Sequence, residues 1–181
     1  MNSGSERKKA ISIRFCGLGG EGVILASIIL GKAAIYDQKN AIQTQSYGAE
    51  QRGTKVRGDV IISDTEPIIN PVIEKPDILI AFSQAAFDSY LPTTVADCQF
   101  FLNSDLITFP TERDAIYRIP ALKLATELSN EKIVNVIMLG ALIKKIPLVS
   151  KESLIKSISG SVSTSIKELN LQAFQKGYDY I

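Results

Sequence analysis

The stretch Phe15–Asp37, FCGLGGEGVILASIILGKAAIYD, places four glycines within six positions, between an apolar strand-like run and an apolar helix-like run. Gly17, Gly19 and Gly22 satisfy the G-x-G-x-x-G pattern of dinucleotide-binding turns. Glycines permit a tight turn and close backbone approach, and the N-terminus of the following helix presents N–H groups to an anion. The stretch therefore predicts a strand, a turn and a helix. It leaves open whether the turn holds a dinucleotide, another phosphate ligand or no ligand at all.

A dinucleotide site also needs an acidic residue about 20 residues further on, which binds the ribose. The corresponding segment, Ile42–Gln45, contains no carboxylate. Glu21 puts a negative side chain inside the turn, where it would repel a pyrophosphate unless it points away. The Gly-Lys-Ser/Thr of a P-loop is also missing. Binding of NAD or FAD is thus disfavoured relative to simple strand–helix packing.

The rest of the chain alternates between strand-like and helix-like segments. Strands are expected at 10–16, 40–45, 59–63, 77–82, 99–102 and 116–119. Helices are expected at 21–36, 83–91 with Ser83 as N-cap, 121–128, 132–145, from 151, and 162–175 with Gly177 as the stop. This alternation predicts a three-layer Rossmann-like α/β fold with a mostly parallel sheet. We expect one domain over 1–181, with 1–9 as a flexible tail.

Composition narrows the chemistry that the chain can perform. A formal net charge of +1 argues against nucleic acid or an acidic membrane as partner, and no signal peptide or membrane span is visible. The chain has no histidine and only two cysteines, Cys16 and Cys98, far apart in the sequence. We therefore expect no metal site, no iron–sulfur cluster and no catalytic residue on this chain, and a reducing, cytoplasmic location.

A second polar segment, Gln43–Gly53 (QTQSYGAEQRG), gathers hydrogen-bonding side chains around two glycines. In an open α/β sheet it would lie beyond a strand end, close to the first turn, where ligands and partners bind. A solvated surface loop is the simpler interpretation.

Together these segments resemble the gamma subunit, or gamma domain, of 2-oxoacid:ferredoxin oxidoreductases. GLGGEG is similar to the family's GxGGQG turn, and QTQSYGAEQRG to its QSYGxExRG loop. KIVNVIMLGALI is similar to its kxxNmxmLGAL helix, and the resemblance extends from about Ile13 to Tyr178. Glu21 and Thr54 depart from the family's glutamine and second glycine. The loop is most similar to the 2-oxoglutarate branch, with pyruvate and branched-chain 2-oxoacids next.

The resemblance implies a fold of the kind called domain III in pyruvate:ferredoxin oxidoreductase. It also implies a non-autonomous subunit of an enzyme that decarboxylates a 2-oxoacid on thiamine diphosphate with Mg²⁺, passes electrons through iron–sulfur clusters to ferredoxin, and forms an acyl-CoA. Those cofactors belong to alpha, beta and ferredoxin-like (delta) partner subunits, with coenzyme A as co-substrate; this chain alone binds none. In isolation it could form a homodimer.

The same resemblance suggests that the two polar segments line a subunit interface beside the coenzyme A site. The candidate residues are Gly17, Gly19, Gly20, Gly22, Gln45, Ser46 and Arg52. Arg52 is the best candidate for a contact with a coenzyme A phosphate or a partner carboxylate. Asn135, within an apolar helix, is either a satisfied buried amide or an interface contact, and we expect the first.

Three other interpretations remain open from the residues. The chain could be a stand-alone dinucleotide-binding protein, a domain related to the beta subunit of indolepyruvate oxidoreductase, or a purely structural α/β protein.

Overall fold

The computed structural model describes residues 10–47, 54–111 and 115–181, and within them six strands form one sheet in the order β2-β3-β1-β4-β5-β6. The strands are β1 (Ile11–Leu18), β2 (Asn40–Ser46), β3 (Lys55–Ser63), β4 (Ile78–Ala81), β5 (Gln99–Asn103) and β6 (Ile116–Ile119). All six lie where the sequence predicts them, and β3 begins four residues earlier than the expected 59–63.

The sheet is mixed, although it is parallel over most of its width. β1, β4, β5 and β6 run parallel to one another, whereas β3 is antiparallel to both β1 and β2. β3 is therefore the one reversed strand of the described sheet. It also separates β2 from β1, which are adjacent in the fold that binds dinucleotides. The second strand thus cannot present a ribose-binding residue directly beside the glycine turn.

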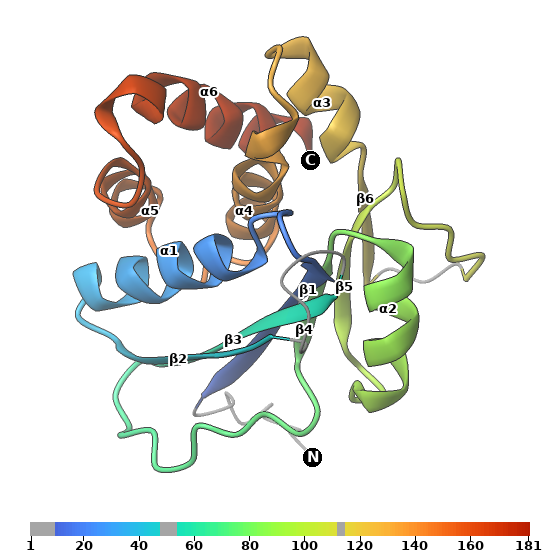
Figure 1. Ribbon diagram of the computed structural model, residues 1–181. Helices are drawn as coiled ribbons and strands as arrows, with labels where there is room; N and C mark the ends of the chain where they lie inside the picture. The colour runs from blue at the N-terminus through green and yellow to red at the C-terminus, as the bar shows by residue number, and fades with distance from the viewer. Residues whose placement is uncertain (1–9, 48–53, 112–114) are drawn as a thin grey trace, which may run out of the picture.

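Helices cover both faces of the sheet, so the predicted three-layer arrangement is confirmed. Figure 1 shows α1, α4, α5 and α6 above the sheet and α2 on the opposite face. The helices are α1 (Val23–Tyr36), α2 (Gln84–Tyr90), α3 (Ala121–Glu127), α4 (Val134–Lys145), α5 (Lys151–Ser159) and α6 (Thr164–Tyr180), with short 3₁₀ turns η1 (Leu91–Thr93) and η2 (Glu131–Ile133). None of the helices in the described ranges is both long and apolar enough to cross a membrane.

Alternate residues of the central strands supply two separate hydrophobic cores. In β4, Ile78 and Ile80 belong to the core under α1 and α4, whereas Leu79 and Ala81 belong to the core under α2. When successive side chains of a strand enter opposite cores, both faces are buried, and the sequence of the strand is a continuous apolar run. This burial explains the sequence of β4 and fixes the position of its carboxyl end.

Gly177 does not end the last helix, contrary to the expectation from sequence. α6 continues through it to Tyr180, because Gly177 lies where α6 crosses α4. A Cβ atom at Gly177 would overlap the carbonyl oxygen of Ile137, and one at Gly140 would overlap that of Phe174. The glycine allows two backbones to approach closely, which a sequence pattern cannot distinguish from a helix stop.

Candidate functional site at the carboxyl edge of the sheet

A crevice opens where the chain leaves β1 and β4 toward opposite faces of the sheet. β1 leads into α1 on one face and β4 leads into α2 on the other, as Figure 1 shows. In open α/β sheets such a divergence is the usual ligand-binding position. Here it holds a cavity of about 330 Å³. The lining residues are Gly20, Glu21, Phe82, Asn103, Leu106, Leu122, Glu131, Lys132 and Val134.

The glycine turn forms one wall of this crevice, and its geometry requires glycines. Gly20 and Gly22 have positive φ angles of 103° and 74°, which side chains rarely adopt. A Cβ atom at Gly22 would also lie 2.5 Å from Nδ2 of Asn135. Asn135 is 2 % exposed, and its Nδ2 donates to the carbonyl oxygen of Gly22 at 3.2 Å. The expectation of a satisfied buried amide is confirmed, and the amide links α4 to the turn.

Glu21 points into the turn rather than away from it. Its Oε2 accepts a hydrogen bond from the backbone N–H of Leu18 at 2.6 Å. The N–H groups of Gly19 and Glu21 donate to the carbonyl oxygens of Thr54 and Leu18. Burial raises the pKa of Glu21, and the Leu18 N–H and the Ser83 hydroxyl offset this only in part. The carboxyl group therefore occupies a backbone donor that a phosphate at this turn would need.

Phe82 after β4 and Asn103 at the end of β5 line the crevice, and Ser83 follows Phe82 in the sequence. Ser83 occupies the N-cap position of α2, as expected, but its side chain makes no capping hydrogen bond. Asn103 is 1 % exposed, and its Nδ2 donates to the carbonyl oxygen of Phe82 at 3.4 Å. Within the described residues, Asn103 Oδ1 has no hydrogen-bond partner. A buried polar atom in this state is rare, so this oxygen calls for an explanation.

The second predicted loop lies apart from this crevice where the structure describes it. Gln45 and Ser46 pair with Gly58 and Arg57 on one side of β3, whereas Gly17 pairs with Val56 on the other side. Two strand spacings, about 10 Å, separate β2 from β1. Arg52 lies outside the described residues. The N–H of Gly19 nevertheless donates to the carbonyl oxygen of Thr54, the first described residue after the loop.

Several residues that complete the crevice were not predicted from the sequence. Asn103 follows the predicted strand 99–102 directly, and a polar residue after a buried strand is a signal that could have identified it. Glu131 and Lys132 lie in η2 and are exposed, and nothing in their sequence distinguishes them from other surface charges.

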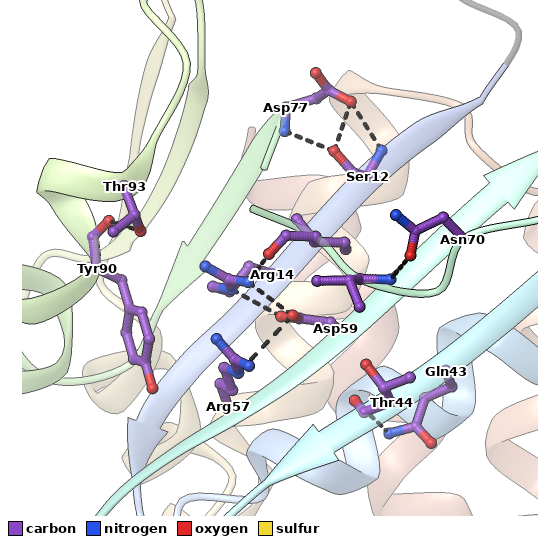
Figure 2. Close-up of polar contacts among 12 residues, drawn as sticks. Ser12, Arg14, Gln43, Thr44, Arg57, Asp59, Asn70, Asp77, Tyr90 and Thr93 are labelled. Atoms are coloured by element: carbon purple, nitrogen blue, oxygen red, sulfur yellow. Dashed lines mark hydrogen bonds and ion pairs between the residues drawn. The ribbon is translucent and has the colours of Figure 1, made fainter. Parts of the chain in front are cut away.

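A second buried polar cluster lies on the face of the sheet toward α2, and Figure 2 shows its contacts. Arg14 in β1 donates from Nε and Nη2 to the two carboxylate oxygens of Asp59 in β3, both at 2.8 Å. Its Nη2 also donates to the carbonyl oxygen of Ile73 at 2.7 Å, and its guanidinium lies 5.4 Å from the ring centre of Tyr90. Burial alone would lower the pKa of Arg14, but the hydrogen bonds and charge of Asp59 outweigh it and raise that pKa. The guanidinium of Arg14 and the carboxylate of Asp59 thus find their hydrogen-bond partners within the chain, and we assign this cluster to stabilising the fold.

The described residues contain no group of three or more side chains suited to hold a metal ion. Cys16 is completely buried, and its burial raises the pKa of the thiol well above the range in which it could act as a nucleophile.

Comparison with known proteins gives the chain its family. The sequence pattern described as pyruvate ferredoxin/flavodoxin oxidoreductase matches residues 12–180. The 2-oxoglutarate synthase subunit KorC of Methanocaldococcus jannaschii is 45% identical, over 92% of this chain and 91% of that protein. The pyruvate synthase subunit PorC of Methanothermobacter marburgensis is 34% identical, over 93% and 96%.

A solved structure supports the same family assignment. The keto/oxoacid ferredoxin oxidoreductase gamma subunit from Geobacter sulfurreducens superposes with a TM-score of 0.81 at 35% identity, covering 93% of this chain and 96% of that one. The chain belongs to the pyruvate ferredoxin/flavodoxin oxidoreductase family.

Proposed function

We propose that this chain is the gamma subunit of a 2-oxoglutarate:ferredoxin oxidoreductase. The observation that carries the proposal is its higher identity, over nearly its whole length, to a 2-oxoglutarate synthase subunit than to a pyruvate synthase subunit. The gamma subunit of a pyruvate:ferredoxin oxidoreductase is the second candidate, supported by the latter similarity.

In this proposal the chain assists the reaction without performing its chemical steps. Thiamine diphosphate, Mg²⁺ and the iron–sulfur clusters belong to alpha, beta and delta partner subunits, and ferredoxin accepts the electrons. Coenzyme A binds at an interface to which this chain contributes. The absence of histidine and the burial of both cysteines are compatible with such a role, because neither a common general base nor an accessible thiol is at hand.

In this proposal the glycine turn Gly17–Gly22 and the second loop Gln45–Gly53 contribute to one shared surface. The hydrogen bond from Gly19 N–H to the carbonyl oxygen of Thr54, the residue that follows the loop in the sequence, supports a joint role. Arg52 supplies a charge-assisted contact to a coenzyme A phosphate or to a partner carboxylate. Arg52→Ala would then weaken coenzyme A use or assembly, whereas Arg52→Lys would recover only part, because an ammonium lacks the planar fork of a guanidinium. Unchanged coenzyme A use and unchanged assembly in Arg52→Ala would exclude this role.

Purification of the tagged chain from native extract tests the function. We expect thiamine diphosphate-binding and ferredoxin-like subunits to co-purify and to reduce a dye in the presence of 2-oxoglutarate and coenzyme A. Faster reduction with pyruvate would favour the second candidate. A chain that purifies without partners, as a homodimer or a monomer, and binds NAD would refute both.

A further inference from the structure

The lining of the crevice includes one buried hydrogen-bond acceptor to which no group of the described residues donates. The bond from Asn103 Nδ2 to the Phe82 carbonyl fixes the orientation of the amide, since Oδ1 in that place would face another acceptor. Asn103 Oδ1 is therefore assigned as the atom without a partner among the described residues. Desolvating such an atom costs free energy unless a donor reaches it.

The charges at the crevice also favour a ligand that carries hydrogen-bond donors, and specifically a cation. Glu21 and Glu131 contribute two carboxylates, and Lys132 contributes one cation. Lys132 and Glu131 are exposed, whereas Glu21 is half-buried beside the turn. A phosphate would meet the Glu21 carboxylate and a Leu18 N–H that is already bonded. A cation would instead gain the carboxylate as its partner.

The apolar part of the lining fits a slender hydrocarbon stem. Phe82, Leu122 and Val134 supply much of the wall, and Leu106, 46 % exposed, supplies the rim. A cavity of about 330 Å³ is at the small end of the range for ligand pockets. Long cationic side chains combine a hydrocarbon stem with a head that has only donors.

We infer that this crevice receives an arginine side chain from a partner subunit, with its guanidinium against Glu21 and Asn103 and its stem against Phe82 and Leu122. A guanidinium has five N–H donors in a planar fork, which suits a carboxylate and a neighbouring amide oxygen together. This inference rests on the proposed function, because it requires partner subunits. It makes the glycine turn a docking point for a cation instead of a phosphate.

The crevice can be tested first on the full chain without partners, so that the result does not depend on the proposed function. n-Butylguanidine carries a guanidinium on a short stem, n-butylurea has a similar shape without the charge, and inorganic phosphate tests the opposite sign. In ¹H–¹⁵N spectra we expect n-butylguanidine to shift the backbone signals of Gly20 and Glu21 and the side-chain amide of Asn103 saturably. The affinity for n-butylurea should be lower by about tenfold or more.

Two variants and a matched control make the outcome specific. Glu21→Gln removes the charge while keeping the shape, and should weaken n-butylguanidine binding about tenfold. Asn103→Leu should weaken it as well, whereas Glu152→Gln, a change of the same kind in the first turn of α5, should leave it unchanged. Shifts of these signals by phosphate, absence of saturable shifts with n-butylguanidine, or equal affinity in Glu21→Gln would overturn the inference.

A competition experiment distinguishes a partner's side chain from a free cation. With the co-purifying subunits, n-butylguanidine should slow reassembly of the complex, and Glu21→Gln should weaken assembly without altering the folded chain's spectrum. If n-butylguanidine binds but assembly is unaffected by it, the crevice takes a free small cation, and the partner assignment is wrong.

Discussion

The two buried polar clusters of this molecule differ in how they are paired. On the α2 side of the sheet, Arg14 and Asp59 satisfy each other with two hydrogen bonds, and Ile73 accepts a third. At the carboxyl edge, the Oδ1 atom of Asn103 has no partner in the parts of the chain that the structure describes. Both clusters are withdrawn from water, so burial does not distinguish them. Complete pairing indicates a role within the fold, and incomplete pairing indicates a role that involves another molecule.

The largest effect is expected from breaking the paired cluster. Asp59→Ala leaves the Arg14 guanidinium, 2 % exposed, without its counter-ion and should cost about 3–5 kcal/mol of unfolding free energy, measured by urea denaturation. The matched control is Asp64→Ala. That carboxylate pairs with Lys39 at 2.8 Å but is 72% exposed, so its loss should cost less than about 1 kcal/mol.

The double variant Arg14→Met/Asp59→Ala should recover part of the lost stability, because no unpaired charge remains. If Asp59→Ala lost no more unfolding free energy than Asp64→Ala, the Arg14–Asp59 pair would not stabilise the fold. The contrast between a paired and an unpaired cluster would then be wrong.

A smaller effect is expected at Asp37, where pairing occurs with little burial. Its carboxylate accepts hydrogen bonds from Ser150 N–H and from the hydroxyls of Ser150 and Ser153, which join the end of α1 to the start of α5. Asp37→Ala should cost about 1–2 kcal/mol at pH 7 in the same denaturation assay. This change tests whether pairing stabilises without deep burial.

The effect of Asp37 should depend on pH. Partial burial raises the pKa of Asp37, but the serine hydrogen bonds and Lys39 outweigh this, and the pKa is lowered overall. The stabilisation is therefore complete above the ordinary value near 4 and is lost as the pH falls through the lower pKa of the folded state. A difference between wild type and Asp37→Ala that is equal at pH 7 and pH 2.5 would contradict the assignment to the ionised carboxylate.

The sequence predicted the fold better than the site, and the reason lies in the range of the interactions. Apolar runs such as the one ending at Phe82 report burial directly, so strands and layers could be assigned locally. The reversed strand β3 and the passage of α6 through Gly177 depend on which segments meet in space. Neither pairing direction nor a backbone crossing is encoded in a short pattern.

The glycine turn shows the same limit at the site. The pattern GLGGEG identified the turn and the presence of an acidic group inside it. It could not indicate that the Glu21 carboxylate accepts from Leu18, or that Asn103, some 80 residues away in the chain, lies across the crevice. Carboxyl ends of neighbouring strands meet at one edge, so the sheet order is needed before such residues can be assembled.

Removing the charge of Glu21 should change the unfolding free energy less than Asp59→Ala does, and in the opposite direction. Burial raises the pKa of Glu21, and the hydrogen bonds from the Leu18 N–H and the Ser83 hydroxyl offset only part of this rise. Folding therefore disfavours the ionised form of Glu21. Stability is then lost as the pH rises through the pKa of the folded state. Glu21→Gln, which can still accept from Leu18, should stabilise the isolated chain at pH 7 by less than about 1 kcal/mol, because the group keeps some contact with solvent.

At pH 3, below the ordinary glutamate pKa, the two proteins should unfold at the same urea concentration. Destabilisation by Glu21→Gln at pH 7 would place Glu21 with Asp59 among the paired groups, and the distinction between the two clusters would no longer hold.

The smallest effect on stability is expected at Asn103. Leucine at this position fills a similar volume, removes the oxygen that has no partner within the described chain, and gives up a long hydrogen bond of 3.4 Å to Phe82. These contributions oppose each other, so the unfolding free energy of the isolated chain should change by less than about 0.5 kcal/mol. The assembled complex should nevertheless dissociate at lower salt, because the partner's guanidinium loses an acceptor. A loss of stability approaching that of Asp59→Ala would mean that the amide is paired for the fold, and the crevice would then need no ligand to explain it.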